Sequence, residues 1–259
     1  MSSAVATETR VIKIGGRPQS SAELPDIVVR ARAANAGLVI VHGGGDEVST
    51  LQSALGGSTK FVNGRRVTLE KDVEIVRMAL SGSANKRLVA RLNDRGVSAV
   101  GLSGEDASLI GAMPMDAEQL GFVGAPTNVN VKLIRHLLDG GYLPVISPVS
   151  RDASGTMGSA LNVNGDDAAA AIAVALGASE LLLVADVEGV MSDGAVVSRL
   201  TPAQAQELIS NGTAAGGMAA KLQAGLAAIA GGVTRVRISD IAAIDDLSRG
   251  THLRAFGDL

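Results

Sequence analysis

Short apolar runs alternate along this chain with longer segments whose apolar residues recur at helical spacing. The runs are rich in Val, Ile and Leu and predict strands over residues 11–14, 37–43, 97–103, 142–149, 180–187 and 234–240. The segments between them predict helices over 21–35, 46–55, 69–80, 83–95, 128–139, 166–176, 202–210 and 218–230. Continuous apolar strands joined by helices are typical of a mainly parallel sheet covered on both faces, so we predict the α/β class.

The pattern weakens over residues 105–127 and 150–164, which indicates hairpins or loops. The chain shows no internal repeat and no long linker. Its 259 residues, 46% of them hydrophobic, suffice for one large domain or for two lobes. If there are two lobes, we expect them to share the sheet and to meet near residue 178.

Composition narrows the classes of partner. The formal net charge is -3 and no basic block occurs, so neither nucleic acid nor an anionic membrane is an expected partner. The absence of cysteine excludes disulfides, thiolate metal sites and cysteine nucleophiles. The first ten residues do not read as a signal peptide, and the longest apolar run is too short to span a bilayer. We therefore expect a soluble, cytoplasmic protein.

Glycine recurs where the predicted strands end, in "VIKIGG", "IVHGGG", "GLSGED" and "VADVEG". Ligands of open α/β sheets bind at that edge, where glycine admits close approach and the next helix offers free N–H groups to an anion. The chain contains no P-loop, G-x-G-x-x-G, G-x-S-x-G or H-E-x-x-H motif. His42 precedes three of these glycines, and we expect it to order the turn rather than to transfer protons.

Basic residues near glycine suggest the chemistry. Lys13 lies inside an apolar run, where a lysine needs a partner, and Gly15 follows it closely. Lys221 lies on the first turns of a predicted helix that "GGMAAK" opens. Two ammonium groups beside a glycine-rich backbone suit phosphoryl transfer, because charge spreads over the phosphoryl oxygens. Arg66, in "FVNGRRVTLE", carries a guanidinium of the kind that pairs bidentately with a carboxylate.

The stretch "SALNVNGDDAAAAIAVALGA" adds polar groups at a strand-to-helix turn. Asn162 and Asn164 are two residues apart, so they share a face if the segment is a strand. Asp166 opens an alanine-rich helix, where we expect it to be the N-cap. A carboxylate fixed there can also hold two lysines in place.

In order along the chain, these motifs resemble the amino acid kinase family, and within it the branch that acts on N-acetylglutamate. The matching segments cover nearly the full length and are "KIGG", "VIVHGGG", "NGRRVT", "SGSANKRLVA", "GLSGED", "GYLPVIS", "LNVNGDDAA", "LLLVADVEGV" and "GGMAAK". The resemblance implies an open three-layer αβα sandwich with a central, mainly parallel sheet. It also implies that ATP phosphorylates the side-chain carboxylate of N-acetyl-L-glutamate in arginine biosynthesis.

The resemblance further implies roles for individual residues. The catalytic set would comprise Lys13 and Lys221, which stabilise the transferring phosphoryl group, and Asp166, which orients them. The acceptor set would comprise Gly44 and Gly45 as a cradle, Arg66 as a clamp on the α-carboxylate, and Asn162 near the acceptor backbone. The ATP site would comprise Gly15, Asp186, Val187, Glu188, Gly189, Val190, Met191, Thr213, Ala214 and Ala215. Mg²⁺ would enter with ATP, held chiefly by its phosphates.

The lobes and the assembly follow from the same resemblance. Residues 1–178 would bind the acylated amino acid and form the dimer, and residues 179–259 would bind ATP. Only about nine residues precede the first predicted strand, too few for the extra N-terminal helix of arginine-inhibited relatives. The segment "ISDIAAIDDLSRGTHLRAF" also lacks the pattern expected of an arginine site. We therefore expect a homodimer without arginine feedback.

Two alternatives remain open at this point. One is a kinase of carrier-protein-linked glutamate or α-aminoadipate in lysine biosynthesis, which needs a basic surface at the acceptor mouth; Lys60, Arg65 and Arg66 could supply one. The other is a nucleotide-binding regulator that kept the fold without the chemistry. The net charge and "LNVNGDD" favour the acetylated acceptor, and the joint presence of Lys13, Asp166 and Lys221 favours an enzyme.

Overall fold

The six predicted strands form the parallel centre of an eleven-stranded sheet. The structure is a computed structural model and describes residues 8–254 except 36, 63, 159 and 193. The sheet order is β13-β15-β14-β10-β1-β2-β8-β6-β7-β9, and β5 also pairs with β8. The central strands are β1 (Arg10–Ile14), β2 (Leu38–His42), β5 (Ala99–Gly104), β8 (Leu143–Asp152), β10 (Glu180–Val184) and β14 (Arg235–Ser239). Each pairs in parallel with its neighbours in this central group, as predicted.

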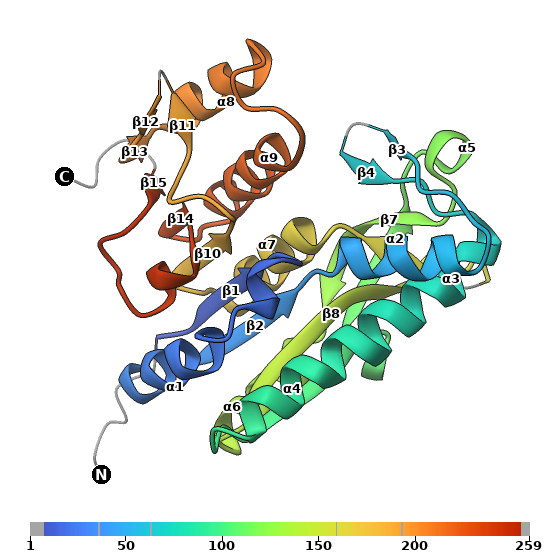
Figure 1. Cartoon of the computed structure of the whole chain (residues 1–259), viewed down its shortest axis with the longest axis horizontal. Helices are drawn as coiled ribbons and strands as arrows, with labels where there is room; N and C mark the ends of the chain where they lie inside the picture. The colour runs from blue at the N-terminus through green and yellow to red at the C-terminus, as the bar shows by residue number, and fades with distance from the viewer. Residues whose placement is uncertain (1–7, 36, 63, 159, 193, 255–259) are drawn as a thin grey trace.

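Helices cover both faces of the sheet (Figure 1). Alternate residues of β1 serve different cores: Val11 packs in a cluster with α6, α7 and α9, whereas Ile12 and Ile14 pack in a cluster with α1 and α4. This burial on both sides explains why the central strands are continuously apolar. The helices are α1 (Leu24–Ala34), α2 (Gly45–Ala54), α3 (Glu70–Arg77), α4 (Asn85–Asn93), α5 (Ala117–Leu120), α6 (Val131–Asp139), α7 (Gly165–Leu176), α8 (Pro202–Ser210) and α9 (Gly216–Ala230).

The two stretches predicted as hairpins or loops extend the sheet with both parallel and antiparallel pairings. Strands β6 (Ile110–Pro114) and β7 (Val123–Val129) pair with each other in antiparallel fashion, and β9 (Ala160–Val163) folds back on β8. In addition, β6 joins β8 and β7 joins β9 in parallel. Several two- or three-residue strands were not predicted, because so short a run carries no alternation. They are β3 (Phe61–Val62), β4 (Arg65–Arg66), β11 (Met191–Ser192), β12 (Ala195–Val196), β13 (Arg199–Leu200) and β15 (Thr251–Leu253).

The expected break between helices 69–80 and 83–95 is absent. A π-helical segment, Met78–Ala84, joins α3 to α4 without interruption. Two hydrogen bonds to β8 hold this segment and the start of α4: Ser81 Oγ lies 2.7 Å from Ser147 Oγ, and Asn85 Nδ2 donates to the Val145 carbonyl oxygen at 2.9 Å. Gly82 lies in the gap expected between the two helices, and these contacts keep the chain helical there.

The predicted lobe boundary at residue 178 falls in the link between α7 and β10. Because β10 pairs with β1, the parts on either side share one sheet. The N-terminal stretch on which the expectation of no docking helix rests lies largely in residues 1–7, outside the described residues. No helix within the described part of the chain is both long and apolar enough to cross a membrane.

Candidate active site

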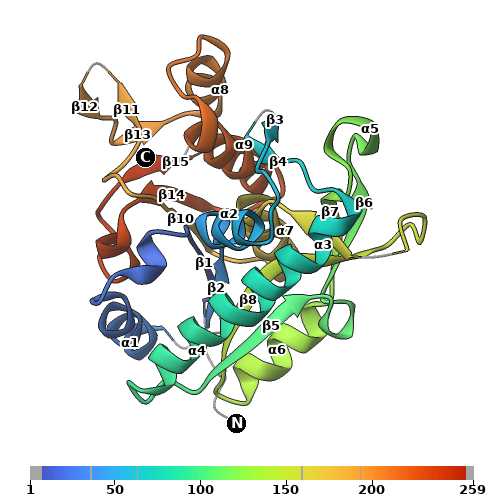
Figure 2. The ribbon, with the colours of Figure 1, turned by 45° about the vertical axis from the view of Figure 1, so that its right-hand side comes forward.

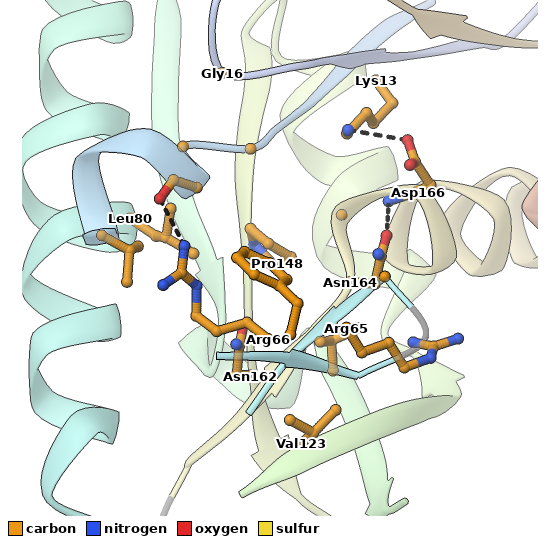
Figure 3. Close-up of a pocket in the computed structure, with 18 residues that line it drawn as sticks. Lys13, Gly16, Arg65, Arg66, Leu80, Val123, Pro148, Asn162, Asn164 and Asp166 are labelled. Atoms are coloured by element: carbon orange, nitrogen blue, oxygen red, sulfur yellow. Dashed lines mark hydrogen bonds and ion pairs between the residues drawn. The ribbon is translucent and has the colours of Figure 1, made fainter. Parts of the chain in front are cut away.

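Lys13, Asp166 and Lys221, predicted from separate motifs, meet at the carboxyl edge of the sheet. Lys13 Nζ lies 2.9 Å from Asp166 Oδ1, and Lys221 Nζ lies 3.1 Å from the same oxygen and 3.2 Å from Oδ2. All three side chains are at most 12% exposed. Figure 3 shows Lys13 reaching from β1 to the first turn of α7. The buried lysine of β1 therefore meets a carboxylate that it shares with a second lysine.

The first turn of α7 leaves the Asp166 carboxylate available to the lysines. The helix begins at Gly165, and its N-cap is Asn164, whose side chain accepts a hydrogen bond from the Asp166 backbone N–H at 2.8 Å. The prediction that Asp166 is the N-cap is therefore wrong by two residues. The reason is local competition: an asparagine two positions earlier satisfies the free N–H of the helix start. Asp166 instead lies in the first turn, where the helix dipole favours its negative charge.

Burial and charge act in opposite directions on this cluster. Burial opposes ionisation of Asp166, but the ammonium groups of Lys13 and Lys221 outweigh it and hold the pKa of the carboxyl below its usual range. Burial and then the charge of Lys13 lower the pKa of Lys221 to about 8, although Asp166 pulls it upward. Two positive charges on one carboxylate leave a net positive site, which suits a polyanionic ligand.

Glycines bring the backbone close to this cluster. Gly44 has φ +150°, and a Cβ there would come within 2.8 Å of Leu80 Cδ2. Gly44 is the N-cap of α2 and Gly45 its first residue, so free N–H groups face this region. A Cβ on Gly165 would lie 3.1 Å from Lys13 Cε. His42 orders the turn as predicted: its Nδ1 lies 2.8 Å from the Gly43 carbonyl oxygen.

A cavity of about 200 Å³ opens on one side of the cluster. Lys13, Gly44, Gly45, Arg66, Asn162 and Asp166 all line it, together with Gly16, Phe61, Arg65, Leu80, Val123, Pro148 and Asn164 (Figure 3). The Arg66 guanidinium donates to the Gly45 carbonyl oxygen at 2.7 Å and to Ser49 Oγ at 2.8 Å. Asn162 Nδ2 donates to Thr68 Oγ1 at 2.9 Å. The residues predicted for the acceptor thus gather around one cavity.

A second cavity, of about 610 Å³, opens on the other side. Gly15, Asp186 and Lys221 line it, and the first turn of α9 contributes Gly217. Gly16 and Gly45 line both cavities, so the two spaces share a glycine wall.

The remaining residues predicted for ATP divide into two groups. The side chains of Val187, Glu188, Met191, Thr213 and Ala215 are exposed. The other group is buried and comprises Gly189, Val190 and Ala214. The Val190 backbone N–H donates to Thr251 Oγ1 at 2.7 Å, so this position fastens the segment between β10 and β11 to β15.

Three residues of the site were missed as participants by the sequence analysis. Asn164 caps α7, and Arg65 pairs with Asp167 at 2.6 Å, from the hairpin β3–β4 to the same helix turn. Arg65 and Asp167 each stand beside a residue that was predicted, and Asn164 lies two positions from Asp166, yet nothing local in the sequence couples positions 65 and 167.

Within the described residues, no three His, Cys, Asp or Glu side chains gather in a way that could hold a metal ion. The carboxylates of Asp46 and Asp186 line the second cavity, and both lie near Arg17, at 3.6 Å from its Nε and 3.8 Å from its Nη1 respectively. Any divalent cation at this site therefore needs ligands beyond those the described chain supplies.

Comparison with known proteins assigns the chain to a family. The model of the amino acid kinase family matches residues 8–240. This chain belongs to the amino acid kinase family. The predicted membership and the open, mainly parallel αβα sandwich are thus confirmed.

The matches to relatives cover most of both chains. It is 43% identical over 235 residues to the acetylglutamate kinase of Cereibacter sphaeroides, covering 89% of this chain and 79% of that protein. It is 41% identical over 233 residues to the acetylglutamate kinase of Geobacillus kaustophilus, covering 89% of each. The crystal structure of smu.665 from Streptococcus mutans superposes with a TM-score of 0.84 at 33% identity, covering 95% of this chain and 98% of that one.

Proposed function

We propose that this protein phosphorylates the side-chain carboxylate of N-acetyl-L-glutamate with ATP, yielding N-acetyl-L-glutamyl 5-phosphate for arginine biosynthesis. The observation that carries the proposal is the buried Lys13–Asp166–Lys221 cluster between two cavities. Lys13 lines the smaller cavity and Lys221 the larger. The acetylglutamate kinases to which the chain is more than 40% identical support the choice of acceptor.

The reaction joins two anions, so neutralising charge and aligning the reactants are the main tasks. An oxygen of the acceptor carboxylate forms a bond to the γ-phosphorus while the bond to the β,γ-bridging oxygen breaks. ADP leaves with that electron pair, and no proton is transferred. Lys13 and Lys221 neutralise the oxygens of the transferring group, and Asp166 keeps the two ammonium groups in place. A general base is not needed, which agrees with a buried His42 that is engaged in ordering the turn.

The acceptor occupies the smaller cavity in this scheme. Gly44 and Gly45 cradle it, Arg66 clamps its α-carboxylate, and Asn162 meets its backbone. For Arg66 this requires exchanging part of its hydrogen bonding to Gly45 and Ser49 for the ligand. The guanidinium is already held 5.0 Å above the Phe61 ring, so little side-chain entropy remains to be lost on binding.

ATP occupies the larger cavity, with Gly15, residues 186–191 and residues 213–215 around it. Mg²⁺ enters with the nucleotide, bound chiefly by phosphate oxygens, and adds positive charge against them. We further propose the lobe assignment 1–178 and 179–259, a cytoplasmic homodimer, and no inhibition by arginine. Arginine titration up to millimolar concentrations tests the last point, with an unchanged rate expected and a dose-dependent loss contradicting it.

The geometry disfavours the carrier-linked alternative. A basic mouth for an acidic carrier needs free cations, but Arg65 is paired with Asp167 and Arg66 is turned inward toward α2. Lys60 remains exposed on the approach. The regulator alternative is disfavoured because burying two lysines against one carboxylate is costly and has no evident structural use.

A coupled assay of ADP release with ATP and Mg²⁺ tests the proposal. It compares N-acetyl-L-glutamate, N-succinyl-L-glutamate, free L-glutamate and carrier-linked glutamate, with Lys221→Ala as control. Turnover of the acetylated acceptor alone, lost in the variant, is expected. Turnover of only the carrier-linked acceptor would establish the first alternative, and tight ATP binding without any turnover would establish the second.

A further inference from the structure

Two consecutive arginines of the β3–β4 hairpin point in opposite directions. Figure 3 shows Arg66 turned toward α2 and Arg65 turned the other way, as the alternation of a strand requires. The Arg65 Nη1 lies 2.6 Å from Asp167 Oδ2, on the first turn of α7. The two side chains are 22% and 19% exposed. Strand β4 therefore places Arg66 at the acceptor cavity, and its neighbour Arg65 forms an ion pair with α7, the helix that carries Asp166.

The other end of this connection lies next to the lysine cluster. Asp166 and Asp167 are adjacent in α7, so a single helical turn holds both the two lysines and the hairpin. The hairpin tip also reaches α9: a Cβ on Gly64 would lie 3.6 Å from the carbonyl oxygen of Gly216. Figure 2 shows the hairpin beside the start of α9. The hairpin is therefore joined to α7 by an ion pair and lies close to the start of α9, and these two helices supply Asp166 and Lys221.

We propose that the Arg65–Asp167 ion pair is a positioning device that holds the hairpin over the acceptor at a fixed distance from the lysine cluster. The inference rests on the proposed function. Arg66 then binds the α-carboxylate of the acceptor, while the side-chain carboxylate of the acceptor lies at the cluster of Lys13, Asp166 and Lys221. Arg65 and Asp167 are positioning residues, because their effect passes through the hairpin and α7. A small displacement of reacting groups is enough to cost a large factor in rate.

The surroundings make this pair stronger than a surface ion pair. Burial raises the pKa of Asp167 and the charge of Arg65 opposes that rise, so the carboxylate depends on its partner. Removing Arg65 leaves a partly buried carboxylate beside the negative charge of Asp166. A matched control exists in the same chain. Arg30 Nε lies 2.6 Å from Asp245 Oδ2, the same separation, but Arg30 is 59% exposed and lies on α1, outside both cavities.

The test compares Arg65→Met, Asp167→Asn and the exchanged pair Arg65→Asp/Asp167→Arg in the full chain. The kinetic readouts are kcat and the two KM values, for N-acetyl-L-glutamate and for ATP. Hydrogen exchange of residues 60–67, where the Val67 N–H bonds to the Lys60 carbonyl oxygen, reports on the hairpin independently of turnover. The control variant is Arg30→Met, and thermal unfolding shows that each protein is folded.

Each single substitution should lower kcat/KM for the acceptor about 10- to 100-fold, leave the KM for ATP within about twofold, and speed exchange in the hairpin. The exchanged pair should recover most of the loss, and Arg30→Met should change none of these readouts. Unchanged exchange and kinetics in both single variants would overturn the inference. A defect in Arg65→Met but not in Asp167→Asn would also overturn it, since Arg65 would then act on the acceptor directly.

The two proposals fail in different ways. If the unmodified protein turns over no acceptor, the proposed function is wrong, whereas the exchange measurement still reports whether the ion pair holds the hairpin. If the unmodified protein is active and the hairpin exchanges equally fast without the pair, only the positioning inference is wrong. An exchanged pair that folds yet recovers neither activity nor protection counts against it as well.

Discussion

Strand β1 carries two buried cations, three residues apart, and each belongs to an ionic cluster on a different face of the sheet. Arg10 meets Glu180 on β10, together with Arg237 on β14. Lys13 meets Asp166 on α7, together with Lys221 on α9. Both clusters gather cations around one carboxylate in the protein interior, two lysines around Asp166 and three arginines around Glu180, the third being Arg235 at 3.5 Å. They differ in the partners of those N–H groups that do not bond to the shared carboxylate.

In the arginine cluster, Arg10 and Arg237 donate to acceptors of the protein itself, whereas the buried Nε of the third arginine, Arg235, has no hydrogen-bond partner among the described residues. The fully buried Arg237 gives its other N–H groups to the carbonyl oxygens of Ala243, Asp246 and Arg249. Arg10 gives another to the carbonyl oxygen of Ile244. These bonds fasten the segment after β14 to the sheet. A cluster whose Arg10 and Arg237 donate in this way to backbone carbonyl oxygens has a structural role.

In the lysine cluster donors remain. An ammonium group has three N–H bonds, and within the described residues Asp166 is the acceptor that both lysines reach. The cluster also faces two cavities, whereas the arginine cluster faces packed backbone. The two clusters are therefore alike in buried charge. What distinguishes the candidate active site is that its free ammonium N–H groups lie beside two cavities.

The largest expected effect comes from breaking the arginine cluster. Arg237→Met leaves Glu180 buried with less compensation and leaves three carbonyl oxygens without their donor. The free energy of unfolding should fall by about 3–5 kcal/mol, measured by urea denaturation. The kcat of the folded fraction should stay within about twofold, because the cluster does not touch the cavities. Arg235→Met, which removes a cation 3.5 Å from Glu180 and 27% exposed, is the control and should cost much less.

Breaking the lysine cluster should give the opposite result. Lys13→Met or Lys221→Met should lower kcat about 10²- to 10³-fold. The free energy of unfolding should change by about 1 kcal/mol or less, since the remaining lysine still pairs with Asp166 and a like-charge contact is lost. Steady-state kinetics and urea denaturation on the same preparations measure both. A loss of stability as large as that of Arg237→Met would mean that the lysine cluster, like the arginine cluster, has a structural role.

The buried His42, which lies near Lys13, makes the stability of the fold depend on pH. Burial has the largest effect on His42 and lowers its pKa to about 4. The hydrogen bond to Gly43 opposes this shift in part, and the charges of Lys13 and Lys86 add smaller downward effects. The folded state therefore takes up this proton only below the pH at which the unfolded chain does. Stability from the neutral ring is complete above about pH 6.5 and is lost toward pH 4, by about 3 kcal/mol.

Urea denaturation between pH 7 and 4 measures this loss against His42→Gln, in which position 42 no longer titrates. The unmodified protein should lose more stability than the variant over this window. Parallel pH profiles would show that His42 does not carry the effect.

The charged residues of the candidate active site could be predicted because each left a local signal. Lys13 interrupts a buried run, Lys221 follows paired glycines, and Asp166 opens a helix. The arginine cluster left none, because Glu180 at the start of an apolar run looks like an ordinary strand end. Its partners come from β1 and β14, and only the sheet order brings them together.

The same limit explains the errors at the site. Two competing capping residues within "NVNGDD" cannot be ranked from composition, so the helix start was placed too late. The β3–β4 hairpin has two residues per strand, below the length at which alternation is visible. Arg65 and Asp167 are 102 positions apart, and a pairing over that distance depends on the finished fold.

The smallest expected effect comes from raising the pH. This deprotonates Lys221 while the arginines of the other cluster stay charged, so it separates the two clusters. Because the pKa of Lys221 is lowered to about 8, its ammonium is present below that pH and is lost above it. The kcat/KM for the acceptor, which reports on the free enzyme, should be level up to about pH 8 and then fall, reaching about tenfold by pH 9. Lys221→Arg keeps its charge throughout, so its own activity, even if lower, should not decline over this range. A decline shared by both proteins would assign the titration to another group, and a level profile in the unmodified protein would mean that Asp166 holds the proton on Lys221 more firmly than burial removes it.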